Sequence, residues 1–374
     1  GHAELEIRLF PNDPAFPEQE DRVISPSIAL QPEFRYEWND GRDRLTATPF
    51  LRYDLDDDER THGDVRALNW THRADNWDVL AGVGRVFWGV AESRHLVDVI
   101  NQVDLVENTD EEDRLGQPMV NVNLFTGFGS VGVFVLPGFR ERTFADNEGR
   151  LRGAREILVN DPRYDSGAEQ YHVDFAARWW HTVGGLDVGV SHFHGTGREP
   201  RLLSETRGGK RFFVPFYDQI DQTSIDAQIT TGAWLFKLEG LTRTGQGDRF
   251  FATVAGFEYT LNGVGGSRAD LGLLAEYHYD GRDDPDLLSS FDKDVFVGVR
   301  LGLNDTESTE ILAAAIIDQS NQTTLLNLEA ERRIGESWKV EMEARFLVNV
   351  DDSEIVLNGI RRDNHLLLRL SRFF

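Results

Sequence analysis

The residues with catalytic or metal-binding potential lie close together near position 192, and their spacing argues against both uses. His192 and His194 are two positions apart, which places both imidazoles on one face of a strand, but no third ligand accompanies them. Ser191 and His192 are adjacent, so on a strand they point to opposite faces and cannot act as nucleophile and base. No Gly-x-Ser-x-Gly element stands out. We therefore expect no enzymatic activity, no metal site and no cofactor.

Acidic residues outnumber basic ones, and the formal net charge is −25. This balance argues against nucleic-acid binding, which favours basic stripes. Three acidic runs, 54–59, 110–113 and 280–286, could offer oxygen ligands to Ca²⁺ or Mg²⁺, but none has the spacing and central glycine of an EF-hand loop. We expect them to be solvated loop tips. The chain has no cysteine, so it holds neither a disulfide nor a thiolate metal site.

A larger set of charged residues alternates with apolar ones, as it would on the two faces of a strand. If the apolar phase faces lipid, the charged phase faces a lumen, where rows of opposite charge would orient ionic or dipolar solutes. The alternative is that these groups pair across strands and fill a narrow interior. The pore-lining candidates are Glu33, Arg35, Arg52, Asp54, Arg178, Asp270, Glu276, Arg300, Glu341, Glu343 and Arg345.

The elements that must position these residues are strands, because apolar residues recur at every second position along the whole chain. Many of the alternating segments run for about 10–14 residues, the length of a tilted membrane strand rather than of a strand in a soluble sandwich. The longest apolar run, 311–317, is too short for a transmembrane helix. Aromatic residues gather near segment ends, as in an interfacial girdle: Tyr36, Trp38, Trp77, Trp234, Tyr277, Tyr279 and Trp338.

The connections between these segments alternate in length, with short turns on one side and mostly long loops on the other. Short turns are expected near 39–42, 75–76, 127–130, 184–185, 231–232, 262–266, 304–306 and 335–336. Longer connections are expected near 56–63, 89–116, 141–170, 196–222, 281–292 and 351–362, with shorter ones on the same side near 244–248 and 319–322. The pattern predicts an all-β, transmembrane, antiparallel up-and-down barrel of about 18 strands, with short periplasmic turns, long extracellular loops and both termini in the periplasm. If a terminal segment is not a strand, about 16 is the better count.

The connection 89–116 is too long for a plain turn and carries its own apolar residues: Leu96, Val97, Val99, Ile100, Val103, Leu105 and Val106. A wholly exposed loop would not need them. We expect this segment to fold into the barrel and form its constriction, with Arg94, Asp98, Asn101 and Asp104 along the path. The alternative is a loop packed against its neighbours outside the pore.

The C-terminal segment 365–374, HLLLRLSRFF, carries a terminal aromatic residue on an alternating strand. Leu366, Leu368, Leu370 and Phe374 keep one phase, which Arg372 interrupts. This segment resembles the last strand of bacterial outer-membrane proteins, and the resemblance implies recognition by the barrel-assembly machinery.

A second resemblance is local. Phe87, Trp88 and Gly89, followed by DVINQVD at 98–104, are similar to a Trp-Gly pair and an Asp-x-x-Asn-Pro-x-Asp element in an early loop of several uncharacterised porin-like families. Gln102 stands where proline is usual. The whole chain resembles porin-like barrels, which implies an outer-membrane location but no particular solute.

These observations predict one barrel domain, 1–374, that serves as an outer-membrane channel for small solutes through a mixed-charge lumen. The alternatives are an uptake barrel that holds a hydrophobic ligand among its loops and releases it sideways, and a structural or adhesive barrel. The expected partners are outer-membrane lipids and lipopolysaccharide, a small solute, and the assembly machinery. The sequence leaves both a monomer and a homotrimer open.

Overall fold

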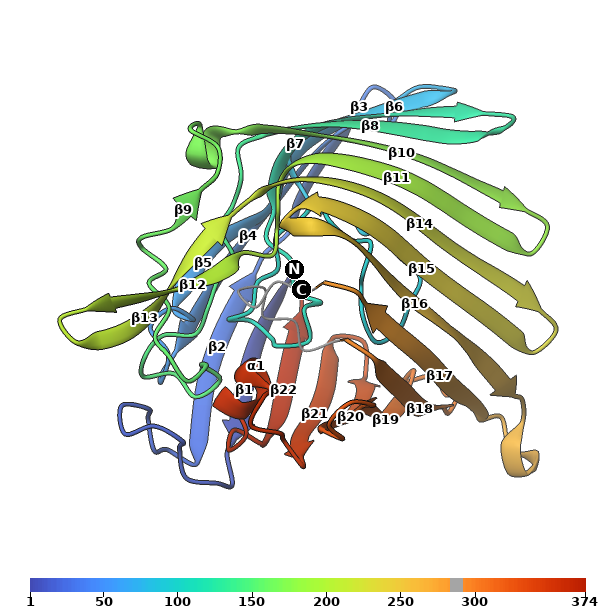
Figure 1. The fold of residues 1–374 in the computed structure, drawn as a ribbon. Helices are drawn as coiled ribbons and strands as arrows, with labels where there is room; N and C mark the ends of the chain where they lie inside the picture. The colour runs from blue at the N-terminus through green and yellow to red at the C-terminus, as the bar shows by residue number, and fades with distance from the viewer. Residues whose placement is uncertain (283–291) are drawn as a thin grey trace.

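The computed structural model describes residues 1–282 and 292–374, which form one closed antiparallel barrel (Figure 1). The barrel closes because β1 (His2–Leu9) pairs with β2 (Ile24–Gln31) on one side and with β22 (His365–Phe373) on the other. β2 and β3 (Phe34–Trp38) pair with successive stretches of β4 (Asp43–Asp54), so they count as one strand of the wall. The wall therefore has 18 strands, which confirms the larger of the two expected counts.

The remaining wall strands follow in chain order, each paired with its neighbour. They are β5 (His62–Arg73), β6 (Trp77–Gly84), β7 (Gln117–Thr126), β8 (Gly129–Pro137), β10 (Val173–Val183), β11 (Leu186–Thr196), β14 (Gln219–Thr231), β15 (Trp234–Gly245), β16 (Gly247–Leu261), β17 (Asp270–Asp280), β18 (Asp294–Gly302), β19 (Glu310–Asp318), β20 (Thr324–Ile334) and β21 (Trp338–Val348).

Alternation along each strand separates an apolar outer face from a mostly polar interior, as in transmembrane barrels. The expected girdle residues are exposed on the outer face: Tyr36, Trp38, Trp77, Trp234 and Trp338 lie near the short-turn end, and Tyr277 and Tyr279 near the other. Arg372, which interrupts the phase of the last strand, pairs with Trp338 in the ladder and stacks on its indole ring at 5.3 Å. A cation at the membrane–water boundary is well placed there.

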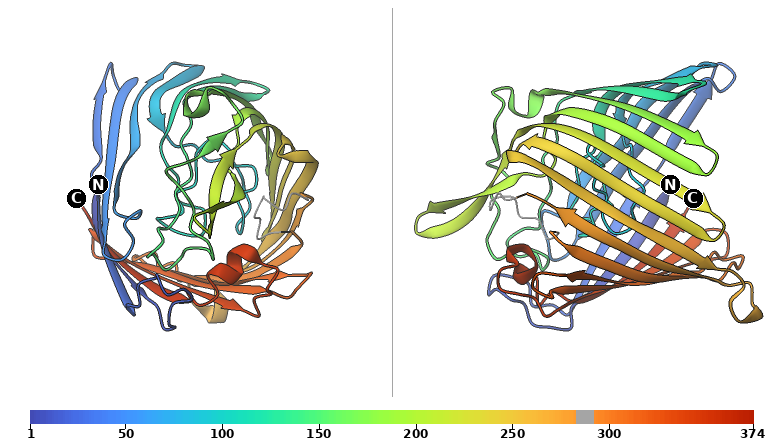
Figure 2. Two further views of the ribbon diagram at one scale, coloured as in Figure 1. Left: turned by 60° about the vertical axis from the view of Figure 1, so that its left-hand side comes forward. Right: turned by 45° about the vertical axis from the view of Figure 1, so that its right-hand side comes forward.

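All eight expected short turns lie at the end of the barrel that holds both termini (Figure 2). Asn39 and Asp40 both have a φ of 55°, the left-handed conformation that a type I′ hairpin turn requires. Two prolines interrupt regular pairing in this part of the wall. Pro32 separates β2 from β3, and Pro49 follows a register shift between β4 and β5.

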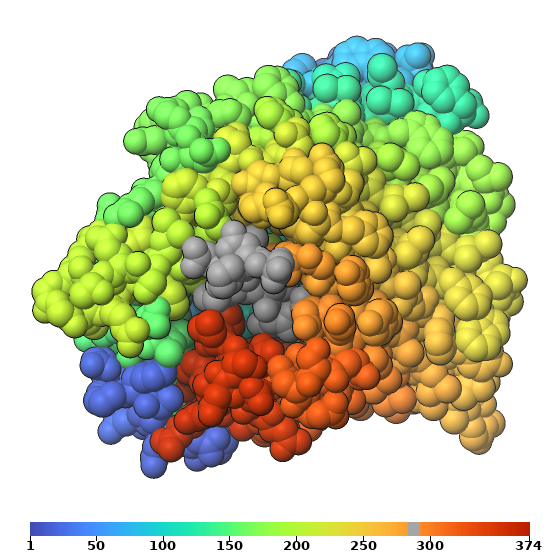
Figure 3. Space-filling model, viewed as in Figure 1, coloured from blue at the N-terminus to red at the C-terminus, as the bar shows by residue number. Residues whose placement is uncertain are grey.

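The opposite end carries the long connections, whose residues crowd together in the space-filling view (Figure 3), and parts of them form secondary structure (Figure 1). The connection expected over 196–222 contains a hairpin, β12 (Arg201–Arg207) and β13 (Lys210–Tyr217), which forms a small second sheet with β9 (Arg163–Tyr164). A short helix, α1 (Ile355–Gly359), lies in the last connection. Two 3₁₀ turns, η1 (Glu169–Tyr171) and η2 (Val264–Gly266), complete the elements of residues 1–282 and 292–374.

The acidic run 280–286 and the connection 281–292 fall largely outside the described residues. Within the described residues, no helix is long and apolar enough to cross a membrane.

Candidate functional site

The lumen is divided by the connection between β6 and β7, residues 85–116, which we call the inserted loop (Figure 2). Its apolar residues Trp88, Val97, Val99 and Ile100 are buried against inward-facing residues of β7, β8, β10, β11 and β14, among them Phe134. Farther around the barrel wall, Ala91 and Leu96 pack on β15 and β16. The apolar pattern of this segment therefore attaches it to one inner wall, because burial in that wall removes the side chains from water.

Two carboxylates of the barrel wall, on β15 and β17, bind the backbone of the inserted loop. Glu239 of β15 accepts hydrogen bonds from the N–H groups of Val90 at 2.6 Å, Ala91 at 2.8 Å and Val97 at 3.1 Å. Glu276 of β17 accepts hydrogen bonds from the N–H groups of Glu92 and Ser93 at 2.8 and 3.0 Å. Bonds from N–H groups to a carboxylate are stronger than neutral ones, so these wall residues position the loop.

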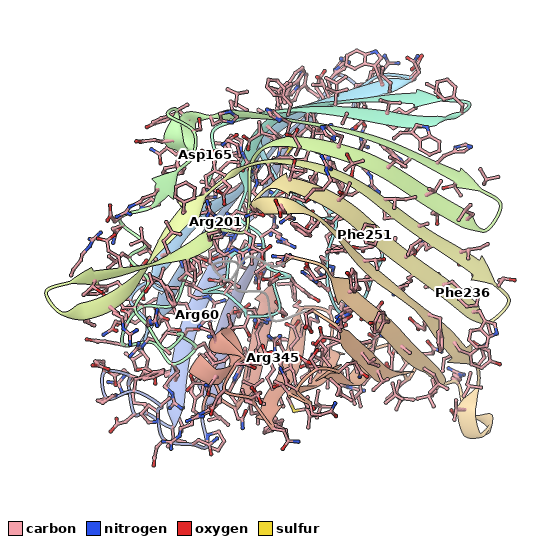
Figure 4. The ribbon with its side chains drawn as sticks, viewed as in Figure 1. Arg60, Asp165, Arg201, Phe236, Phe251 and Arg345 are labelled. Carbon is pink, nitrogen blue, oxygen red and sulfur yellow. The ribbon has the colours of Figure 1, made fainter. Side chains whose placement is uncertain are left out.

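A cluster of arginines joins the return of the loop to β4 and β5. Arg52 forms an ion pair with Glu107 of the loop at 2.8 Å, and Arg60 (labelled in Figure 4) donates to the carbonyl of Val106 at 2.7 Å. Arg60 also pairs with Glu6 at 2.7 Å. These side chains are nearly inaccessible to solvent, so the cluster fills this side of the interior.

Between these two attachments the loop touches β21. Arg345, on β21 in Figure 4, pairs with Asp110 at 2.7 Å and donates to Thr109 Oγ1 at 2.8 Å. Asn108 donates to Glu343 at 3.0 Å. The acidic run 110–113 therefore lies inside the barrel, which corrects its expected position at a solvated tip.

The four residues expected along the constriction divide into two pairs. Arg94, paired with Asp280 at 2.9 Å, and Asp98, paired with Arg114 at 3.3 Å, line a cavity beside the loop. Burial raises the pKa of Asp98 to about 6, against the opposing charge of Arg114.

The structure corrects the expected position of the other pair, because Asn101 and Asp104 are 0% exposed. Asn101 donates to the carbonyls of Gly84 and Leu115 and closes the neck of the loop. Asp104 pairs with Arg66 of β5 at 2.7 Å.

The expected pore-lining residues are nearly all held by partners. Glu33 pairs with Arg35, Asp54 with Arg60, Arg178 with Asp226, Arg300 with Glu92 and Glu258, Glu341 with Lys339, and Arg345 with Glu343. Arg52 and Glu276 hold the loop, as described above. Asp270 accepts hydrogen bonds from Gly263 N–H and Asn304 Nδ2 at the short-turn end. Ion pairs within and between strands, together with loop attachment, therefore use much of the charge that the sequence assigned to the pore.

A cavity of about 430 Å³ remains between the inserted loop and the wall β18–β21. The strand register places the inward-facing residues of this wall in rows. An apolar row lies toward the long-loop end: Phe296, Ile316, Leu325 and Leu347. The next row toward the periplasm holds Gly298, Ala314, Asn327 and Arg345, and the row after it holds Arg300, Leu312, Glu329 and Glu343. The wall thus changes from apolar, through a row of two small and two polar residues, to a mostly charged row.

Sequence reasoning missed Glu239 as a loop anchor and missed the apolar row. In β19 the row was hidden because 311–317 is apolar on both faces, so the inward-facing Ile316 could not be told from the lipid-facing residues. His192 and His194 are more than half exposed and lie on the outer face, where His194 approaches Asp221 at 2.9 Å.

One group of residues in the described part of the chain brings three metal-type ligands together. His62, Asp104 and Glu107 have ligand atoms within 4.8 Å of one another. Arg66 already lies 2.7 Å from Asp104, and Arg52 lies 2.8 Å from Glu107. Because the arginines neutralise both carboxylates, the group is better described as part of the ion-pair cluster than as a metal site.

Comparison with known proteins finds no matching family model and no matching curated sequence. Among solved structures, the chain is similar to Wzi of Escherichia coli, an outer-membrane protein involved in group 1 capsule assembly and described as a carbohydrate-binding β-barrel. The identity is 10%, the match covers 100% of this chain and 84% of Wzi, and the TM-score is 0.54. It is also similar to a BenF-like porin from Pseudomonas fluorescens, at 8% identity, 99% and 97% coverage and a TM-score of 0.54. The chain therefore has the fold of a bacterial outer-membrane porin-type barrel.

Proposed function

We propose that the protein is an outer-membrane channel through which small solutes pass between the inserted loop and the wall β18–β21. The observation that carries this proposal is the cavity at that place. Elsewhere the loop is held by the carboxylates of Glu239 and Glu276 and by the buried arginine cluster. Ala314 lines the cavity and leaves room that a larger side chain would fill, and Gly298 beside it makes space for the ring of Phe296.

The inserted loop acts in this proposal as the constriction. Arg94 and Asp98 line the path, whereas Asn101 and Asp104 maintain the shape of the loop from within it. The charges along the path are of both signs, so ions and dipolar solutes would experience a transverse field.

The test is the conductance of purified protein in planar bilayers under a KCl gradient. We expect discrete open-channel steps and a reversal potential biased towards cations. The chain carries a net charge of −25, and acidic residues line the end of the cavity that faces the short turns. A silent bilayer, with a folded and heat-modifiable barrel, would contradict the proposal. If channels open, solutes of several classes are compared in the same recordings, and sugars are included because Wzi is described as carbohydrate-binding.

A second candidate is an uptake barrel for hydrophobic compounds, and the apolar row favours it. An apolar patch on the inner face of a barrel wall is unusual, because lumens are generally polar. Continuous pairing of β18, β19, β20 and β21 at this level favours exit to the periplasm over sideways release. Ligand that copurifies in the cavity, in protein that does not conduct, would support this candidate.

We also propose lipid, lipopolysaccharide and the barrel-assembly machinery as partners of the protein. The apolar outer face with its aromatic girdles is suited to lipid and lipopolysaccharide, and the terminal strand to the assembly machinery. A homotrimer would be detected as a threefold larger mass in mild detergent and as grouped conductance steps.

A further inference from the structure

The cavity beside the inserted loop has two chemically different ends. Its upper wall is the apolar row, in which Phe296 pairs with Ile316, Ile316 with Leu325 and Leu325 with Leu347. All four side chains line the cavity. The apolar residues of the short helix α1 line it as well. A body without polar groups would be withdrawn from water between these surfaces, at roughly 25 cal/mol per Å² of apolar area.

The lower end is acidic. Asp110 and Glu112 of the loop face this part of the cavity with Glu329 of β20, and all three line it. The basic residues Arg345 and Arg300 lie at this end, and both are already paired. Arg345 pairs with Asp110 and Glu343 at 2.7 and 3.1 Å, and Arg300, in the row of Glu329, pairs with Glu92 and Glu258. Burial, together with the negative charge of Asp110, Glu329, Asp113 and Glu343, raises the pKa of Glu112 to about 7.

Most arginines nearer the mouth do not offset this charge, because they are held by carboxylates; Arg155, also in the lining, donates to Ser204 Oγ at 3.0 Å and stacks on Phe213. Arg198 pairs with Asp174 at 2.7 Å, and Arg282 pairs with Glu199 at 2.7 Å. Arg94 pairs with Asp280. The carboxylates at the lower end therefore lie in excess over their counter-ions, and they lie below a surface suited to hydrocarbon or an aromatic ring.

We propose that the cavity binds an amphipathic organic cation, with its apolar body against the row Phe296–Ile316–Leu325–Leu347 and its ammonium group towards Asp110, Glu112 and Glu329. This inference rests on the proposed channel and names the class of solute that its path would select. The volume of about 430 Å³ is sufficient for such a molecule, since small-molecule sites commonly occupy roughly 300–1,000 Å³. The strand order places the ammonium group on the periplasmic side of the apolar body, so the charged end would lead during uptake.

The test compares three probes that share one apolar body: 3-phenylpropylammonium, 3-phenylpropanol and 3-phenylpropanoate. Their affinities for the detergent-solubilised protein are measured by calorimetry, and their block of single channels is recorded in bilayers. We expect the ammonium compound to bind about tenfold more tightly than the alcohol, and the carboxylate to bind most weakly. Equal or tighter binding of the carboxylate would overturn the inference without any variant being needed.

Variants then assign the two ends. Glu329→Gln should weaken the ammonium probe about tenfold and leave the alcohol unchanged, because it removes a charge and keeps the shape of the side chain. Leu325→Ser should weaken both probes. Glu331→Gln is the matched control: Glu331 lies two residues along the same strand, with Lys339 at 2.8 Å, and outside the cavity lining. An ammonium affinity that is the same in Glu329→Gln as in the unchanged protein would contradict the assigned site.

The proposed channel and the proposed binding of an organic cation can be refuted independently. Open-channel steps without selective binding of the ammonium probe would retain the channel and refute the inference. Selective binding in detergent by a protein that never conducts would retain the inference about the cavity and refute the channel.

Discussion

Replacing Glu239 by glutamine should loosen the inserted loop from the β15 wall. The carboxylate of Glu239 is 0% exposed and accepts three backbone hydrogen bonds, two on Oε1 from Val90 and Ala91 and one on Oε2 from Val97. A glutamine retains one oxygen, but its amide group would place an N–H donor opposite the N–H of Val97. That bond is lost, and the other two lose the strengthening that an ionised acceptor provides.

The loss amounts to about 2 kcal/mol, because a hydrogen bond to a charged group contributes about 1.5–3 kcal/mol and an unsatisfied buried donor adds its own penalty. This corresponds to a roughly 30-fold shift in the ratio of attached to detached loop. Glu276 and the arginine cluster still hold the loop at other points, so the barrel itself should remain folded.

The assay is single-channel recording, in which the variant should show more frequent excursions to a larger conductance. Glu331→Gln, which removes the same charge near the short-turn end of the barrel, should behave as the unchanged protein. If Glu239→Gln gave the same conductance and the same noise as this control, the carboxylate would not position the loop, and the reasoning would be refuted.

Three further predictions concern the loop and the interior. Deleting 95–106 should raise single-channel conductance, since this part of the loop packs on the inner wall, and an unchanged value would count against a constriction. Burial, together with neighbouring carboxylates, raises the pKa of Glu112, which lines the cavity, and of Asp113 next to it to about 7, so negative charge at the path increases as the pH rises through that value. The reversal potential should shift towards greater cation selectivity from pH 6 to pH 8. The attached loop binds more protons than a detached loop, so attachment is favoured at the lower pH. Arg60→Ala should cost about 3–5 kcal/mol, because it removes the arginine that pairs with the buried carboxylate of Asp54 at 2.5 Å, and the loss would appear as a lower temperature for the heat-modifiable shift on gels.

The barrel was predictable because its determinants are local and repeated. Alternation such as that of Trp338–Val348 sets the two faces of each strand, and turn residues such as Asn39 and Asp40 set where strands end. The strand count depended on the terminal segments, and the pairing of His2 with Phe373 resolves it.

The interior was less predictable, because it depends on which residues meet across the lumen. Glu239 is one carboxylate among many in the sequence, and its role appears when Val90, Ala91 and Val97 come within hydrogen-bond distance. Asn101 was expected along the path as a polar residue of the inward-folded segment 89–116, but its amide is used to close the loop on itself.

The central claim is that solutes pass between the inserted loop and the wall β18–β21, and thiol accessibility tests it most directly because the chain contains no cysteine. Ala314→Cys places a thiol on the wall beside the cavity, whereas Ala176→Cys places one beneath the loop on the opposite wall. A bulky charged thiol reagent added during single-channel recording should block the Ala314→Cys channel in discrete steps and leave Ala176→Cys conducting. Block of Ala176→Cys with an unaffected Ala314→Cys would place the path on the other side of the loop and contradict the account.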